Sequence, residues 1–281
     1  MEKIGYMSKD KFSATWISHS SLSDYLKCPR AYYLKNMWKN AAGHKVSVMS
    51  PALALGQSVH EVVESLSIIP SGTRFNTDLL VKFDLSWRKV TGLKGGFTSE
   101  SQEADAKKRG ETMLGRVMAN PGPLKNKTIK IRETVPYYWL SEDDNIILCG
   151  KIDWLEYVPE SDSVNIIDFK TGKYDEDPES LQLPIYFLLA GHTQSRPISK
   201  AFYWYLDRDD APREVIPPDL VESEKKILML AKKIALARKL NHFQCPQAGG
   251  CRSCDGLEKV FLGKADLVGT NDFGQDVYVL P

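Results

Sequence analysis

The chain has 281 residues and a formal net charge of +1, from 37 basic and 36 acidic side chains. With 42% hydrophobic and 26% charged residues it can form an ordinary globular core. The balanced charge excludes a strongly basic nucleic-acid binder, so any affinity for phosphate must come from local patches. No apolar stretch approaches the roughly 20 residues that span a bilayer, and Met1–Tyr6 lacks a signal-peptide pattern, so we expect a cytoplasmic protein that does not contact membranes.

The first part of the chain is predicted to be mainly helical. Ser18 or Ser20 can cap a helix that ends at Lys27, and Pro29 suits the first position of a second helix that runs to about Met37. Apolar periodicity predicts three further helices, and the last two form a helical insertion. Their ranges are 51–67, 75–90 and 99–119.

Strands are predicted mainly in the middle of the chain. The predicted order is three strands at about 128–140, 145–158 and 163–170, a helix from Pro178 to Ala190, a strand at 201–206 and a helix over 218–242. This order predicts a mixed α/β fold in which helices flank a small sheet. We expect one domain (1–281) with an N-terminal helical part, a helical insertion, a sheet core and a C-terminal part (1–50, 70–122, 123–210 and 211–281). The strand-like segment Asp276–Leu280 has no predicted neighbour.

The apolar run Val164–Gly172 carries the strongest functional signal. It contains Asp168, Phe169 and Lys170, and because side chains of a strand alternate between faces, Asp168 and Lys170 emerge on one side. Asp153 lies in the preceding predicted strand, across a turn-like segment. Antiparallel pairing across that turn can place Asp153 beside Asp168.

Two neighbouring carboxylates and a lysine suit a divalent cation. Like charges repel and raise one pKa unless a cation lies between them. Mg²⁺ or Mn²⁺ prefers oxygen ligands and is held by one or two carboxylates together with the oxygens of a phosphate substrate. The residues therefore suit metal-dependent phosphodiester hydrolysis, with an exposed salt bridge on a strand as the alternative.

The cysteines are unevenly placed. Five in a chain without a secretion signal favour metal or redox use over disulfides. Cys28 lies near the N-terminus, Cys149 lies in a predicted strand, and Cys245, Cys251 and Cys254 crowd a glycine-rich segment. We expect Cys149 to be a small buried apolar residue.

Five sequence blocks together resemble the PD-(D/E)XK nuclease superfamily, and most closely its RecB/AddB-like branch, which includes the CRISPR-associated Cas-four-type nucleases. The blocks are Ser20–Leu34, Gly56–His60, Gly150–Asp153, Ile167–Gly172 and Gln182–Tyr186, in the order of the family. The resemblance implies a restriction-endonuclease-like core, in which a cysteine-bound cluster joins the two ends of the chain.

The resemblance also implies roles for single residues. His60, Asp153, Asp168 and the backbone carbonyl of Phe169 would bind the metal, and Lys170 would act on the attacking water. Gln182 and Tyr186, which share one face of a helix, would lie near the scissile strand. Without the family context, His60 would be read as a packed or surface histidine, and Gln182 and Tyr186 as an ordinary helix face. Glu64 lies one turn after His60 on the same helical face and could bind or orient a partner, but we favour a solvated acid at this position.

Relatives of this branch often bind a 4Fe-4S cluster through one early and three late cysteines. Cys28 matches the early ligand, and Cys251 and Cys254 match the late pair. The usual last cysteine is absent, and Cys245 stands before the pair instead. Thiolate ligands suit either an iron–sulfur cluster or zinc, so zinc is the alternative.

The implied function is that of a Mg²⁺- or Mn²⁺-dependent deoxyribonuclease. We expect action on single-stranded DNA or DNA ends, as an exonuclease rather than an endonuclease. CRISPR adaptation, recombination and repair, and phage DNA processing all use this architecture, with protein partners in the first two. The alternative from another class is a noncatalytic nucleic-acid-binding subunit with the same fold.

Overall fold

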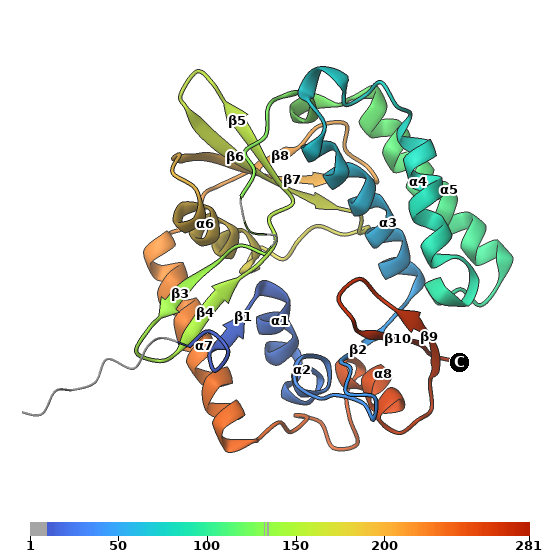
Figure 1. Ribbon diagram of the computed structural model, residues 1–281, viewed down its shortest axis with the longest axis vertical. Coiled ribbons are helices and arrows are strands. Elements are labelled where there is room, and N and C mark those ends of the chain that lie inside the picture. The colour runs from blue at the N-terminus through green and yellow to red at the C-terminus, as the bar shows by residue number, and fades with distance from the viewer. Residues whose placement is uncertain (1–9, 132, 134) are drawn as a thin grey trace, which may run out of the picture.

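A four-stranded sheet carries the segment with the Asp-Phe-Lys motif in the computed structural model, which describes residues 10–131, 133 and 135–281 (Figure 1). The strand order is β5–β6–β7–β8. β6 pairs antiparallel with β5 and parallel with β7, and β7 pairs antiparallel with β8. The strands are β5 Trp154–Val158, β6 Ser163–Lys170, β7 Ile198–Tyr205 and β8 Arg213–Val215.

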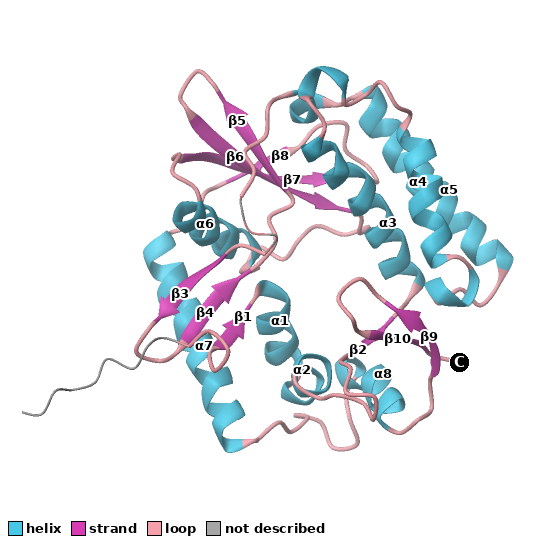
Figure 2. Cartoon of the chain, viewed as in Figure 1, coloured by secondary structure: helices cyan, strands magenta, loops and turns pink. Residues whose placement is uncertain are grey.

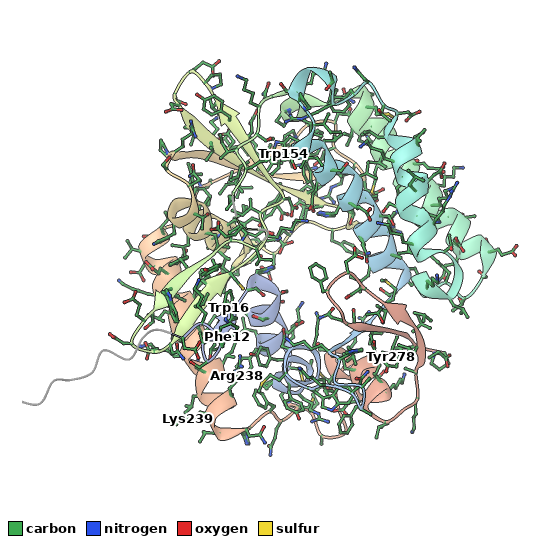
Figure 3. The ribbon with its side chains drawn as sticks, in the orientation of Figure 1. Phe12, Trp16, Trp154, Arg238, Lys239 and Tyr278 are labelled. Atoms are coloured by element: carbon green, nitrogen blue, oxygen red, sulfur yellow. The ribbon has the colours of Figure 1, made fainter. Side chains whose placement is uncertain are left out.

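Alternation along β6 gives this sheet two buried faces. Val164 and Ile166 belong to one apolar core with α6 and α7, whereas Ile167 and Phe169 belong to a second core with α3, α4 and α5. Figure 2 shows the two helical groups on opposite sides of the sheet, and Trp154 packs in the second core (Figure 3). The helices are α3 Pro51–Ser65, α4 Leu79–Trp87, α5 Glu100–Ala119, α6 Gln182–Thr193 and α7 Leu220–Leu240.

Two smaller sheets join distant parts of the chain. One has the order β1–β4–β3 and the other β2–β10–β9, and in each an early strand pairs parallel with a much later one. The second of these lies beside α1, α2 and α8 in Figure 1. The strands are β1 Thr15–Ile17, β2 Val46–Val48, β3 Tyr137–Ser141, β4 Ile146–Cys149, β9 Asp266–Thr270 and β10 Asp276–Val279. The helices are α1 His19–Lys27, α2 Pro29–Asn36 and α8 Arg252–Phe261.

Short 3-10 turns complete the secondary structure of the described residues. They are Leu66–Ile68, Ser71–Thr73, Arg88–Val90, Gly92–Gly95 and Gly122–Lys125. None of the helices in the described ranges combines the length and apolar content that crossing a bilayer requires.

The mixed α/β class predicted from the sequence is confirmed, but two predicted strands were wrong in extent. The strand predicted at 145–158 is two strands in different sheets, β4 and β5. The chain leaves one sheet at Gly150, where the ideal Cβ position lies 3.1 Å from Leu189 Cδ1. The strand predicted at 128–140 is confined to β3, with one isolated bridge at Thr128, and residues 132 and 134 lie outside the described residues.

Helix boundaries differ from prediction in two places. The helix expected from Pro178 begins at Gln182, because Asp177 instead forms a turn in which its side chain accepts from Glu179 N and its carbonyl from Ser180 N. Helix α8 was not predicted. Gly256 lies inside this helix and does not end it. A Cβ added at Gly256 would lie 3.2 Å from Leu280 Cδ1, so the glycine allows the C-terminal segment to approach α8 closely.

Candidate active site and cysteine cluster

Helix α3 presents His60 to the edge of the central sheet. Ser50 caps this helix by accepting a hydrogen bond from Leu53 N, and Pro51 occupies its first turn. Gly56 lies one turn before His60, where an added Cβ would be 3.2 Å from Thr171 Oγ1. The glycine therefore lets α3 approach the end of β6 closely, which places His60 over the sheet edge.

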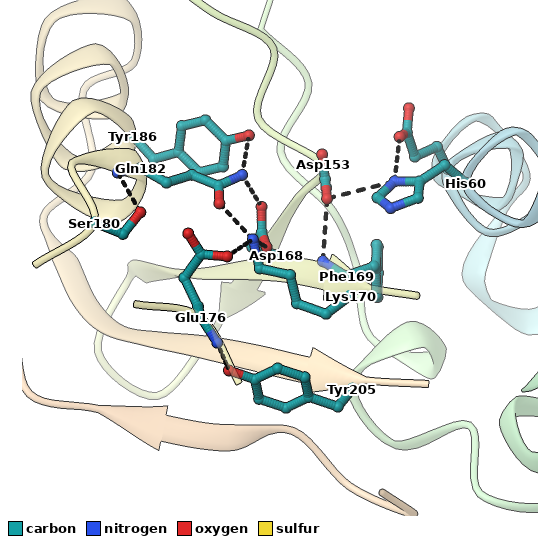
Figure 4. Close-up of polar contacts among 11 residues, drawn as sticks. His60, Asp153, Asp168, Phe169, Lys170, Glu176, Ser180, Gln182, Tyr186 and Tyr205 are labelled. Carbon is teal, nitrogen blue, oxygen red and sulfur yellow. Dashed lines mark hydrogen bonds and ion pairs between the residues drawn. The ribbon is translucent and has the colours of Figure 1, made fainter. Parts of the chain in front are cut away.

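Strand pairing brings Asp153 and Asp168 to the same edge. Trp154 pairs with Ile167, so Asp153 stands just beyond the last pair, opposite Asp168. Asp153 Oδ2 accepts a hydrogen bond from Phe169 N at 3.0 Å and lies 3.6 Å from His60 Nδ1 (Figure 4). The structure therefore places Asp153 beside Asp168, as antiparallel pairing of the two segments predicted.

Lys170 lies on the same sheet face as Asp168, in a dense polar network. Its Nζ is 2.9 Å from Asp168 Oδ2 and 2.8 Å from Glu176 Oε2, and it donates to Gln182 Oε1 (Figure 4). Gln182 Nε2 donates to Asp168 Oδ1 at 2.7 Å and to Tyr186 OH at 3.2 Å. Because Gln182 is the first residue of α6, its amide bridges the helix and the strand.

Burial sets the electrostatics of the two acids. It raises the pKa of Asp153 to about 7, and the charge of Asp168 adds to this rise. Burial also raises the pKa of Asp168, against the opposing effect of Lys170. Burial alone would lower the pKa of Lys170, but the charges of Asp168 and Glu176 outweigh it and raise that pKa. Without a further cation, the site cannot hold both carboxylates ionised at low cost.

His60 is partnered by Glu64. His60 Nδ1 and Glu64 Oε1 are 3.1 Å apart, and Glu64 also pairs with Lys151. Burial tends to lower the pKa of His60, but the hydrogen bond with Glu64 and the charge of Asp153 raise it. Only 15% of the Glu64 side chain is exposed, so the expectation of a solvated acid was wrong.

The residues singled out by the sequence thus converge on one site: His60, Asp153, Asp168, Phe169, Lys170, Gln182 and Tyr186 (Figure 4). Sequence reasoning missed Glu176, which pairs with Lys170 and whose backbone N–H donates to Tyr205 OH at 2.9 Å. An acid in a loop of several acids gives no local signal for such a contact.

The donor set fits a hard divalent ion. One ligand atom each from His60, Glu64 and Asp153 lies within 4.8 Å of the others. Asp168 Oδ2 is buried, and Lys170 Nζ is its ion-pair partner at 2.9 Å. The carboxylate oxygens of this set are the ligands that Mg²⁺ or Mn²⁺ prefers, and these are the ions that metal-dependent phosphodiester hydrolysis uses.

The four cysteines of the sequence pattern form a second group. Sγ atoms of Cys28, Cys245, Cys251 and Cys254 lie within 4.8 Å of one another. Cys28 lies between α1 and α2, whereas Cys251 caps α8, so the group connects the N- and C-terminal parts of the chain. Burial raises the pKa of Cys28 to about 12, which disfavours a lone thiolate at that position. This sulfur donor set could hold a metal ion or an iron–sulfur cluster.

An ion pair supports the same junction. Arg30 on α2 donates to Glu258 on α8 through Nε at 2.6 Å and Nη2 at 3.2 Å. Cys149, in contrast, lies in β4 away from the four-cysteine group and is only partly buried, although burial raises its pKa to about 11.

Comparison with known proteins identifies the class. The family model described as the PD-(D/E)XK nuclease superfamily matches residues 16–256. The chain therefore belongs to the PD-(D/E)XK nuclease superfamily. Among solved structures, the crystal structure of a presumed exonuclease from Eubacterium rectale has a TM-score of 0.51 at 14% identity, over 91% of this chain and 92% of that chain. This likeness shows a shared fold. Among curated proteins, none matches.

Proposed function

We propose that the protein is a Mg²⁺- or Mn²⁺-dependent deoxyribonuclease. The main support for this proposal is that Asp153 and Asp168 are buried together at one sheet edge, beside Lys170 and His60. Two acids whose burial raises their pKa values gain from a dication that binds the ionised forms. A lysine next to them serves no evident purpose in a passive binding protein, and this argues against the noncatalytic alternative.

The metal would be held by His60, Asp153, Asp168 and the carbonyl of Phe169. Glu64 orients the imidazole through its contact with His60 Nδ1. A bound divalent ion supplies charge stabilisation at the phosphate and lowers the pKa of the attacking water. Lys170 then orients that water and neutralises charge that develops on the phosphate.

Gln182 and Tyr186 fix the catalytic groups in position. Gln182 Oε1 accepts a hydrogen bond from Lys170 Nζ, and Gln182 Nε2 donates one to Asp168 Oδ1, so a single amide holds the acid and the amine in fixed relative positions. Tyr186 accepts the second hydrogen bond of the same amide. We therefore assign these two residues to the positioning of Lys170 and the scissile strand.

The substrate we propose is single-stranded DNA or DNA ends, cleaved as an exonuclease. The solved structure from Eubacterium rectale, named as a presumed exonuclease, supports this mode, as does the resemblance to RecB/AddB-like and Cas-four-type nucleases. CRISPR adaptation, recombination and repair, and phage DNA processing are the pathways that such an activity would serve, with protein partners in an adaptation or recombination complex.

We propose a 4Fe-4S cluster at Cys28, Cys245, Cys251 and Cys254, with zinc as the alternative. The support is a closed set of four sulfur donors drawn from both ends of the chain. Anaerobic purification separates the two. A brown protein with iron and acid-labile sulfide supports the cluster, and a colourless protein with stoichiometric zinc overturns it.

The activity is tested with end-labelled single- and double-stranded DNA in Mg²⁺ or Mn²⁺. We expect cleavage that EDTA abolishes and that Lys170→Ala reduces by about 10³-fold. The matched control is Lys173→Ala, since Lys173 is an exposed lysine on the following loop. Cleavage that persists in EDTA and in a folded Lys170→Ala variant would refute the proposal.

A further inference from the structure

A cavity of about 420 Å³ lies next to the catalytic lysine, between α1 and the loop that precedes α6. Residues of α1 form one wall, and the segment from Glu176 to Leu181 forms the other. Glu176 lines this cavity while its carboxylate lies 2.8 Å from Lys170 Nζ. The Glu176 side chain therefore separates the cavity from the Lys170 ammonium, which acts at the scissile phosphate in the proposed function.

Three leucines and a histidine contribute apolar and aromatic surface to the walls. Leu22, Leu26 and Leu181 line the cavity, and 57% of Leu26 is exposed. His19 joins them at the first turn of α1, half-buried, and its imidazole makes no hydrogen bond or ion pair within the described ranges. An aromatic ring and leucine side chains form the kind of surface on which nucleobases stack, whatever their sequence.

The charge of the loop wall favours a base over a phosphate. Glu176, Asp177 and Glu179 line it; Lys170 and Lys226 pair with the two glutamates, which leaves Asp177 as the carboxylate of this wall without an ion pair among the described residues, and its charge disfavours a phosphate group. Carboxylate oxygens do accept hydrogen bonds from the amino groups of bases. Lys27 of α1, an exposed cation, also lines the cavity and can pair with a phosphate of the nucleic-acid backbone.

A second cavity on the other side of the same loop is less suited to a base. It is lined by Tyr203 and Tyr205, but a cation already lies over each of these rings. Lys170 Nζ lies 4.9 Å from the Tyr203 ring centroid, and Arg208 lies 4.2 Å from that of Tyr205. The ring faces under these cations cannot stack on a base.

We propose that the cavity between α1 and residues 176–181 receives the nucleobase adjacent to the scissile phosphate. The proposal rests on the proposed nuclease function and specifies how that site holds its substrate. Seating one base in the cavity requires an unpaired nucleotide, because a base within a duplex is stacked and paired. The cavity would thus account for the preference for single strands and DNA ends that we propose above.

Substrates that lack one base test the proposal. End-labelled single strands with one abasic residue, placed at successive positions around the cleavage site, are compared with the intact strand in Mg²⁺. For the wild type we expect a single position at which loss of the base raises KM about tenfold and changes kcat less than twofold.

Variants that alter the cavity should remove this position effect. Ser23→Trp fills the space from α1, and Leu26→Ala removes part of its wall. Both should raise KM for the intact strand and become insensitive to the missing base. Their matched controls are Ser101→Trp on the exposed face of α5 and Leu85→Ala on α4, a leucine with the same 57% exposure.

The outcomes separate the two claims. If the wild type cleaves intact and abasic strands alike at all positions, or if the folded Leu26→Ala variant keeps the full position effect, the base cavity is refuted while the nuclease stands. If the folded wild type cleaves no DNA in Mg²⁺ or Mn²⁺, the proposed function fails, and the cavity proposal fails with it.

Discussion

The carboxylate site and the four-cysteine group are built in different ways from the same chain. The carboxylate site draws Asp153, Asp168 and Lys170 from two adjacent strands and adds His60 from a helix packed on the sheet edge. The cysteine group instead draws Cys28 from one end of the chain and its other three members from the opposite end. Apolar packing of the sheet and α3 holds the first site, whereas a small apolar core, an ion pair and the sulfur atoms join α2 to α8.

This difference separates chemistry from architecture. The ionised acids of the carboxylate site destabilise the metal-free fold, because burial disfavours their charged forms and raises their pKa values. Such a cost is typical of sites that bind a metal or a substrate. The cysteine group has a small core of its own, and a bound metal or cluster would cross-link two distant segments and so stabilise the native state. Damage to the first site should therefore reduce activity, and damage to the second should reduce stability.

The largest expected effect is the loss of activity in Asp153→Asn. Cleavage should fall by about 10³-fold or more, because the amide is neutral and cannot replace a metal-binding carboxylate. Thermal stability without metal should stay equal or rise, since the amide oxygen can still accept from Phe169 N and no charge is buried. Single-turnover cleavage and thermal unfolding measure the two. Asp143→Asn, at an exposed turn, is the control, and a marked loss of stability in Asp153→Asn would contradict the comparison.

The second effect is on stability, in Cys28→Ser. Loss of one sulfur ligand should release the metal or cluster and lower the free energy of unfolding by about 3 kcal/mol or more, or Tm by roughly 6–12 °C. Thermal unfolding and metal analysis of the purified protein provide the measurement. Cys149→Ser should retain the full metal content. An unchanged Tm in Cys28→Ser would show that the two ends are held by packing alone.

A third effect is pH dependence in the metal-free protein. Because the folded pKa of Asp153, at about 7, lies above its ordinary value of 3.8, the protonated form stabilises the fold at acid pH. This contribution is fully present below about pH 4 and is lost as the pH rises through about 7. The Tm of the wild type should therefore fall relative to that of Asp153→Asn across this range. Saturating Mg²⁺ should reverse the trend, and a constant difference in Tm without metal would argue against the raised pKa.

The smallest effect concerns the helix that carries His60. Gly56→Ala places a methyl group 3.2 Å from Thr171 Oγ1, so α3 must shift slightly and kcat should fall about two- to tenfold. Stability should not fall, because alanine favours a helix interior. Gly115→Ala on α5, where an added Cβ meets nothing within 4 Å, should leave kcat unchanged. Full activity in Gly56→Ala would mean that the position of His60 tolerates the shift.

Local pattern was enough to predict much of the carboxylate site. The period of two along β6 placed Asp168 and Lys170 on one face, and a single turn placed Asp153 opposite them. It was not enough for the strand predicted at 145–158, because β4 and β5 pair with partners in different sheets, and Gly150 between them packs closely against Leu189 on α6, which is distant in sequence. Glu176 was missed for the same reason, since its partner Lys170 is reached only through the fold of a loop.

The sequence by itself determined the strand that carries Asp168 and Lys170, the order of the motifs and the superfamily they indicate. These depend on spacing within short segments, where backbone geometry fixes which side chains share a face. Only the tertiary structure decided that Glu64 is half-buried against His60, that Cys251 and Cys254 lie at the start of a helix, α8, and that α1 and the loop before α6 enclose a cavity. Such contacts join segments far apart in the chain, and they are set by the packing of the whole core rather than by any local preference.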